Sequence, residues 1–377
     1  MNHAMYESEP LTHWMLDDFN NFLIWAAELN CSDINLVPND PVWIKVYGDW
    51  HAVTRRPVGA GEIRDLLDAI TGSPSSSART AGAEALDFRH EIKLDRSRKI
   101  RFRVNATSCR DGFSSGINMV MRSIPDTPPD LEELNLEPGI LSSCFPSNGL
   151  VLVAGVMGSG KSTLISSILG EIIKKHKKNV ATYEAPIEFD LMSIPRKSGP
   201  IVQAEVPSHL ESFSDAIRAT TRKAQDVCLI GELRDLETMK GMITMSEVGV
   251  AAYGTVHTRS VAETPSRIIN SFPDDVQNQI AVTLLSSLKL IIYQRLVKSV
   301  DGKRVALREF YAFDDEDKNH LIDNKANLYH EISALIERKG QSLLSDAQKK
   351  FRQGIIDQET FHLIEEEFSS KKLARAA

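Results

Sequence analysis

The chain has 377 residues, of which 42% are hydrophobic and 25% charged, and its formal net charge is −7. This length is long for one hydrophobic core and predicts two domains. The acidic balance argues against general nucleic-acid binding, which depends on neutralising phosphates, so no nucleic-acid partner is expected. The longest apolar run, Ala281 to Val297, is interrupted by serine, lysine, glutamine and arginine, so we expect no transmembrane segment.

The N-terminus and the cysteines indicate the cellular compartment. Residues 1–10 lack a basic segment followed by an apolar one, so we expect no secretory signal and a cytoplasmic location. The cysteines Cys31, Cys109, Cys144 and Cys228 are scattered, without the Cys-x-x-Cys pair that would suggest zinc. Their spacing favours reduced thiols.

Residues 1–124 read as an α/β domain. Apolar residues over 15–30 recur at spacings of three and four, which is typical of an amphipathic helix, and 33–53 alternates in the manner of half-buried strands. A second helix is expected around 60–70, a polar loop over 73–82 and further strands over 86–124. The proline-dense stretch Pro125 to Pro129 then predicts a stiff linker, which we place at 125–138.

The second domain, 139–377, alternates strands with helices, which predicts a parallel sheet covered by helices. Ser208 and Glu211 have the spacing of a capping box at the start of one of these helices. From about residue 325 the chain is charge-rich with apolar residues at helical spacing, so we expect appended C-terminal helices. The expected strands are 150–154, 179–183, 201–206, 226–233 and 250–257, and the expected helices are 161–175, 209–225 and 236–247.

The first of these strands leads into a phosphate-binding pattern. Residues 155–162 fit G-x-x-x-x-G-K-[ST], in which glycines let the backbone amides point at a phosphate and the following helix adds its positive end. Lys161 is expected to reach the β- and γ-phosphates and Ser162 to place a hydroxyl on Mg²⁺. The sequence therefore predicts a site for ATP and Mg²⁺ built from Gly155, Val156, Met157, Gly158, Ser159, Gly160, Lys161, Ser162 and Thr163.

Polar residues follow three more strands, and in open parallel sheets ligands lie beyond such strand ends. We assign Glu232 as the general base for hydrolysis, Glu184 to the shell of metal-bound water, with Glu188 as a secondary acid, and His257 as a hydrogen-bond donor to the γ-phosphate. Each assignment has an alternative that the residues leave open. In these alternatives, Glu232 only forms a salt bridge with Arg234, Glu188 is a solvated loop acid, and His257 has a structural role.

The phosphate loop, Thr182 to Phe189, Gly231 to Thr238 and Gly254 to Thr258 together resemble the four boxes of the PilT-like type II/IV secretion ATPase superfamily. Ser32 to Leu36 and Arg101 to Asn105 resemble stretches of its PAS-like N-terminal domain, and Gln294 to Leu296 resembles a late signature. Within the superfamily the chain is similar to the ATPases of Dot/Icm type IVB secretion systems. The resemblance covers about residues 30 to 300.

This resemblance implies a PAS-like N-terminal domain joined by the proline-rich linker to a RecA-like ATPase domain. It further implies a homohexamer that is recruited to membrane-embedded components of a secretion apparatus at the inner membrane. Nucleotide would be held between the two domains, with arginines of the N-terminal domain reaching the phosphates. The matching arginines are Arg101, Arg103, Arg110 and Arg122.

Two positions depart from the family pattern. Ala185 stands where the second box usually has aspartate, and Val250 stands where the histidine box often has a first histidine. Because pilus retraction motors commonly carry both, the departures favour a secretion ATPase over a pilus motor. A pilus retraction or assembly motor remains an alternative, as does a scaffold that binds ATP with negligible hydrolysis.

Overall fold

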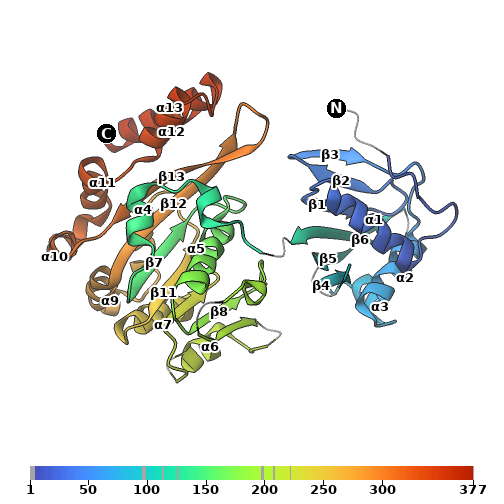
Figure 1. Cartoon of the computed structure of the whole chain (residues 1–377), viewed down its shortest axis with the longest axis horizontal. Coiled ribbons are helices and arrows are strands. Elements are labelled where there is room, and N and C mark those ends of the chain that lie inside the picture. Colours follow the sequence, from blue (N-terminus) through green and yellow to red (C-terminus); the bar gives the residue numbers. More distant parts are fainter. Residues whose placement is uncertain are drawn as a thin grey trace. The chain divides into compact units, whose positions relative to one another are not determined.

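The computed structural model describes residues 5–95, 99–112, 114–124, 127–196, 199–206, 209–220 and 222–376, with side chains to residue 368. The chain divides into two compact units, Met1–Asp126 and Thr127–Ala377 (Figure 1). Pro125 and Asp126 of the predicted linker and Ser208 of the predicted capping box lie outside the described residues.

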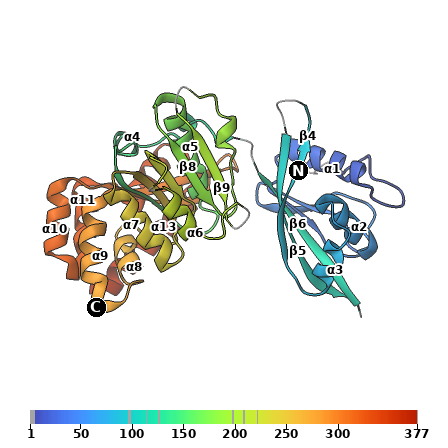
Figure 2. The ribbon, with the colours of Figure 1, turned by 90° about the horizontal axis from the view of Figure 1, so that it is seen from below.

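The N-terminal unit is a six-stranded antiparallel sheet in the order β3-β2-β1-β6-β5-β4. Helices α1 and α2 lie on one face (Figure 2), where Phe22 and Leu66 pack against Phe102 and Met119 of the sheet. The elements are α1 (Leu16–Glu28), β1 (Asp33–Leu36), β2 (Trp43–Val46), β3 (Asp49–Ala52), α2 (Ala60–Thr71), α3 (Ser76–Ala81), β4 (Leu86–Lys93), β5 (Lys99–Asp111) and β6 (Ser114–Ile124).

The loop predicted over 73–82 is wrong, because α3 occupies most of it. The carboxylate of Asp68, in α2, accepts hydrogen bonds from the Ser77 amide and hydroxyl, each at 2.7 Å, and so supports the first turn of α3. The buried Thr80 hydroxyl donates back to the Ser76 carbonyl at 3.0 Å. Small polar residues therefore form a helix here through side-chain contacts that lie outside the local pattern.

The second unit is a seven-stranded sheet in the order β13-β12-β7-β11-β10-β8-β9, parallel except for β13. Its elements are a 3-10 turn (Leu131–Leu134), α4 (Pro138–Ser143), β7 (Gly149–Ala154), α5 (Lys161–Lys175), β8 (Val180–Glu184), a 3-10 turn (Leu191–Ser193), β9 (Ile201–Glu205), α6 (Phe213–Thr220), β10 (Val227–Ile230), α7 (Leu236–Glu247), β11 (Ala251–Val256), α8 (Glu263–Ile269), α9 (Asp274–Ser287), β12 (Leu288–Lys298), β13 (Arg304–Ala312), α10 (Asp315–Asp323), a 3-10 turn (Lys325–Asn327), α11 (Leu328–Lys339), α12 (Leu343–Arg352) and α13 (Gln358–Ala376).

The sheet of the second unit is covered on both faces. Successive side chains of a strand point to opposite faces, so Val151 and Val153 of β7 pack with α5, whereas Leu150 and Leu152 pack with α7, α9 and α11. This explains why β7 is a continuous apolar run rather than an alternating one. Figure 1 shows β7 in the interior of the sheet.

Three expectations for this unit change. The helix predicted over 209–225 is shorter, because α6 begins at Phe213, where Ser212 and Asp215 form the cap: the Asp215 amide donates to the Ser212 hydroxyl at 3.2 Å.

The run Ala281 to Val297 divides into the end of α9 and most of β12, and no helix among the described residues is long and apolar enough to cross a membrane. Residues 127–138 of the predicted linker belong to this unit, since Leu131 and Leu136 pack into its core with α5.

The C-terminal hairpin α12–α13 is appended to the outer strand of the sheet. Ala347, Ile356 and Ile364 pack on Leu307 of β13. Arg295 of β12 also pairs with Glu367 of α13 at 2.6 Å. The predicted C-terminal helices are therefore present and tied to the two last strands.

Candidate functional site

Four neighbouring strands carry the predicted site residues at one edge of the sheet. Strands β7, β11, β10 and β8 are consecutive and parallel, so their carboxyl ends lie side by side. The phosphate loop follows β7, His257 follows β11, Glu232 follows β10 and Glu184 ends β8. Sheet topology thus gathers residues that are separated by up to 102 positions in the chain, from Gly155 to His257.

The phosphate loop has a backbone that only glycine accommodates at two positions. Gly155 has φ +151°, and a Cβ there would lie 2.5 Å from both the Gln294 carbonyl oxygen and Ser159 Oγ. Gly160 has φ +80°, and its Cβ would lie 2.9 Å from Gln294 Nε2. The backbone therefore curls against β12 in a way that a side chain at either position would prevent.

Lys161 is the first residue of α5, and its ammonium is buried in the loop. It donates to the carbonyls of Gly155 at 2.8 Å and Val156 at 3.0 Å. Burial lowers its pKa, against the raising effect of the negative charges of Glu232 and Glu188. A buried lysine aimed into a curled loop is a point charge already placed for a phosphate.

The groups present fit a polyphosphate with its magnesium ion. Ser159 Oγ is buried and has no hydrogen-bond partner among the described residues, so the phosphate loop contains an unsatisfied polar group. Ser162 and Thr163 are half-buried in the first turn of α5, whereas Val156 and Met157 at the loop tip are exposed. Hydroxyl and carboxylate oxygens are the donors that Mg²⁺ prefers.

Glu232 is held between two basic side chains. Its carboxylate lies 2.6 Å from Arg234 Nη2 and 3.0 Å from His257 Nε2. Burial raises the pKa of Glu232, but the hydrogen bond from Arg234 and the charges of Arg234, His257 and Lys161 outweigh burial, so the net pKa lies below the ordinary value. The salt bridge with Arg234 is therefore present, and His257 joins it.

Glu184 stands in the opposite electrostatic situation. Its side chain is buried, and desolvation raises its pKa to about 7 although Thr182 Oγ1 donates to it at 2.7 Å and Gln203 Nε2 at 3.3 Å. Gly231 packs directly against it, since a Cβ there would lie 3.2 Å from Glu184 Cα. Glu188, one turn further on, is exposed.

The two departures from the family pattern lie in different places. Ala185 directly follows β8 at the site edge and is exposed. Val250 precedes β11 and is buried at the opposite end of that strand from His257, where its carbonyl accepts from the Gly149 amide at 3.2 Å. A side chain at position 250 of this unit is therefore remote from the phosphate loop.

The four N-terminal arginines do not form a single cluster. Arg103 and Arg122 are cross-strand partners on β5 and β6 and pair with Asp87 and Asp33, with nitrogen to oxygen distances of 2.5 and 2.9 Å. Arg101 is buried two residues from Arg103. Arg110 lies at the other end of β5, where its Nε donates to the Gly112 carbonyl at 3.1 Å.

Three side chains that shape the site received no role from the sequence, and a fourth, Arg234, was named there only in the alternative salt bridge with Glu232. Arg234 pairs with Glu232, and Thr182 and Gln203 hold Glu184, while Gln294 donates to the loop carbonyl of Ser159 at 2.8 Å. Polar residues inside otherwise apolar strands were the available signal for Thr182 and Gln294, because a buried polar group needs a partner. The partner of Thr182 is Glu184 on the same strand, whereas the partner of Gln294 is Ser159 in the phosphate loop, which the pattern along β12 does not reveal.

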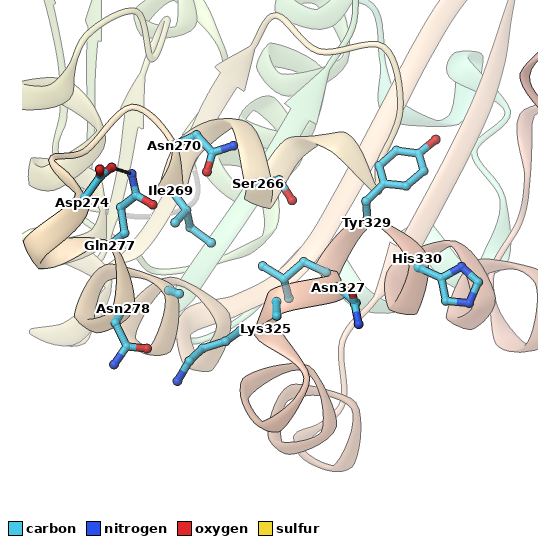
Figure 3. Close-up of a pocket in the computed structure, with 13 residues that line it drawn as sticks. Ser266, Ile269, Asn270, Asp274, Gln277, Asn278, Lys325, Asn327, Tyr329 and His330 are labelled. Atoms are coloured by element: carbon cyan, nitrogen blue, oxygen red, sulfur yellow. Dashed lines mark hydrogen bonds between the residues drawn. The ribbon is translucent and has the colours of Figure 1, made fainter. Parts of the chain in front are cut away.

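A separate groove of 630 Å³ lies on α8, α9 and the start of α11. Its lining includes the amide side chains of Asn270, Gln277 and Asn327, together with Lys325 and His330 (Figure 3). Gln277 is already engaged, because its Nε2 donates to Asp274 at 3.0 Å. None of the predicted site residues lines this groove.

Comparison with known proteins agrees with the arrangement. The family model of the type II/IV secretion system protein matches residues 86–323. The twitching motility protein of Neisseria gonorrhoeae is 31% identical over 350 residues, which cover 88% of this chain and 90% of that protein. The type IV pilus retractation ATPase PilT of Pseudomonas aeruginosa is 31% identical over 84% of this chain and 88% of its own length.

Solved structures extend the likeness to both units. The ATPase DotB of Legionella pneumophila superposes with a TM-score of 0.89 and 35% identity, covering 96% of this chain and 98% of that one. The pilus retraction motor PilT with bound ADP gives a TM-score of 0.77 and 30% identity, covering 90% and 95%. These matches confirm the predicted resemblance and the two-domain α/β fold. The chain belongs to the type II/IV secretion system ATPase family.

Proposed function

We propose that this chain is a cytoplasmic ATPase that hydrolyses Mg-ATP and converts the hydrolysis into domain motion at a membrane secretion machine. The observation that carries the proposal is the succession β7, β11, β10 and β8, whose ends bear the phosphate loop, His257, Glu232 and Glu184. A phosphate cradle beside two carboxylates and an imidazole is the set of groups that phosphoanhydride hydrolysis uses.

Each side chain has a role in this proposal. The loop amides and Lys161 hold the β- and γ-phosphates, and Ser162 offers a hydroxyl to the magnesium ion. When bound, magnesium neutralises charge that develops on the phosphates. Glu232 is ionised at neutral pH because its pKa lies below the ordinary value, so it is able to accept a proton from water. Glu184 would orient water held by that ion, and His257 would donate a hydrogen bond to the γ-phosphate.

A ring of six identical subunits with nucleotide held between the two units is a further part of the proposal. Family membership supports it, and Arg101, Arg103, Arg110 and Arg122 are the candidates to reach the phosphates. Arg103 and Arg122 already have carboxylate partners, so a phosphate would replace those ion pairs. Mass measurement with Mg-ATP should give about six times the 42.0 kDa of one chain, and a monomer in every nucleotide state would contradict the ring.

Delivery or assembly in a Dot/Icm-like type IV secretion system is the finer assignment. The TM-score of 0.89 with DotB, against 0.77 with PilT, supports it, as does Ala185 at the site edge. A pilus retraction motor is the second candidate, because PilT is a sequence relative at 31% identity. A Glu232→Gln variant held on its partner by bound ATP should co-purify with inner-membrane secretion components, whereas recovery with pilus components favours the motor.

A scaffold that binds ATP without hydrolysing it is the alternative from a different class. Steady-state phosphate release from Mg-ATP by the purified chain separates the two. The proposal predicts turnover that is lost in Lys161→Ala together with nucleotide binding, because the buried ammonium is placed for the phosphates. Tight ATP binding with no phosphate release, in the presence of the membrane components, supports the scaffold instead.

A further inference from the structure

Behind the phosphate loop lies a buried polar cluster that the proposed hydrolysis does not use. Gln294 of β12 and Arg308 of β13 are cross-strand partners, and each is 4% exposed. Glu137, before α4, and Asp346, on α12, are 7% and 1% exposed. Burying one positive and two negative charges is costly unless they are paired and hydrogen-bonded.

The cluster is connected through Arg308. Its Nε donates to Gln294 Oε1 at 3.0 Å, its Nη2 to the Leu134 carbonyl at 3.0 Å, and its Nη1 lies 3.4 Å from Glu137. The Arg308 amide donates to Asp346 at 2.8 Å. The guanidinium and its neighbours therefore fix the amide group of Gln294, with its oxygen toward Arg308 and its nitrogen toward the loop.

The nitrogen of Gln294 acts on one peptide of the phosphate loop. Nε2 donates to the Ser159 carbonyl at 2.8 Å. In a planar trans peptide the carbonyl and the following N–H point in opposite directions. Holding the Ser159 carbonyl against β12 therefore turns the Gly160 N–H away from β12, to the loop interior. Gly160, with φ +80°, has no side chain that would resist the opposite orientation.

We propose that Gln294 is a positioning residue for phosphate binding, which presets the Gly160 amide as a phosphate donor. Arg308, Glu137 and the C-terminal hairpin residue Asp346 support it from behind. This inference rests on the proposed nucleotide-binding function. It assigns a role in the reaction to a side chain that touches the loop backbone rather than the nucleotide.

The test compares Gln294→Met with a matched control, Gln225→Met, in the full-length protein. Gln225 is also buried and precedes β10 at the opposite end of the sheet, where its amide donates to the Tyr183 hydroxyl at 3.3 Å. Binding of Mg-ADP is measured by calorimetry, and KM and kcat by phosphate release. Thermal unfolding of both variants measures the purely structural effect of losing a buried amide.

We expect Gln294→Met to weaken Mg-ADP binding about tenfold, as the loss of one well-placed donor implies. KM for Mg-ATP should rise by a similar factor with kcat within about twofold, because the phosphate contact exists in both ground and transition states. Gln225→Met should leave binding unchanged. Gln294→Glu keeps the acceptor for Arg308 but has no donor for Ser159, so it should lose binding without a matching loss of thermal stability.

Mg-ADP binding by Gln294→Met or by folded Gln294→Glu as tight as that of the wild type overturns the inference. A loss of affinity shared equally by Gln225→Met does so as well, since it would mark a general effect of destabilisation. If the wild-type protein itself binds no nucleotide, the proposed function fails instead. The two failures are therefore distinguishable.

Discussion

Glu184 and Glu232 end neighbouring strands, yet their surroundings push the two carboxyl groups in opposite directions. Desolvation raises the pKa of Glu184 to about 7, whereas Arg234 and His257 bring the pKa of Glu232 below the ordinary value. Pairs of acids whose environments separate their pKa values are common where one must stay ionised and the other exchange protons. The low pKa keeps Glu232 ionised at neutral pH, which its proposed role as the base requires.

The raised pKa of Glu184 predicts a pH-dependent cost to folding. Below about pH 4.5, the ordinary pKa of glutamate, the group is protonated in both states and costs nothing. Between about 4.5 and 7 the unfolded chain releases the proton while the folded chain keeps it, so stability falls as pH rises. Above about 7 the cost is complete, at about 3 kcal/mol.

Glu184→Gln should therefore be more stable than the wild type at pH 8 and differ little at pH 5. Chemical unfolding of both proteins at the two pH values measures this, with exposed Glu237→Gln as the control. A difference between wild type and Glu184→Gln that does not change with pH would show that Glu184 is not desolvated in the folded protein.

At the scale of single residues, the sequence predicted which residues lie together at the strand ends, but not all of the side chains that hydrogen-bond to them. The phosphate loop, Glu184, Glu232 and His257 follow recognisable strands, and parallel topology brings such ends together. Gln203 and Gln294 act through partners on other segments of the chain, Glu184 of β8 and Ser159 of the phosphate loop. Their roles depend on strand order, which the hydrophobic pattern of one strand does not contain.

At the scale of the elements, helix α6 begins later than its capping signal in the sequence predicts. The spacing of Ser208 and Glu211 predicts a helix that begins at residue 209, but the helix begins at Phe213, with Ser212 and Asp215 in the capping positions. His209 instead returns to β9, where its Nδ1 accepts from the Glu205 amide at 2.9 Å. This local contact engages His209 with the end of β9, and the helix begins one turn later.

Two substitutions separate the predicted cap from the observed one. Ser212→Ala should reduce the free energy of unfolding by about 1 kcal/mol, because the Asp215 amide loses its acceptor. Glu211→Gln should have almost no effect, since Glu211 is exposed before the helix begins. Denaturant titration measures both, and the reverse order of effects would restore the predicted start.

Among elements, the helices that follow strong signals were the most predictable. Residues 161–175 and 236–247 match α5 and α7 at both ends, because a glycine-lysine turn and an Asp235 cap mark their starts. Strands β12 and β13 were missed, since the apolar run before residue 297 fits helix and strand alike. Those two strands support the phosphate loop from behind.

At the scale of the whole molecule, two units of different architecture share one chain. The antiparallel N-terminal sheet and the parallel C-terminal sheet have separate cores, as the composition and length predict. Arg101, Arg103, Arg110 and Arg122 lie in the first unit, and the phosphate loop lies in the second. In our proposal, hydrolysis changes how the arginines of one unit engage phosphates held by the other. This change couples ATP hydrolysis to domain motion.

The central claim is that this chain turns over ATP with Glu232 as the base. Phosphate release and ATP binding by wild type and Glu232→Gln, at equal protein and Mg-ATP concentrations, test it most directly. We predict that Glu232→Gln binds ATP as tightly as the wild type, because Lys161 and the loop are intact, and that its turnover falls at least 100-fold, the scale of a lost general base. Undiminished phosphate release by Glu232→Gln would contradict the claim.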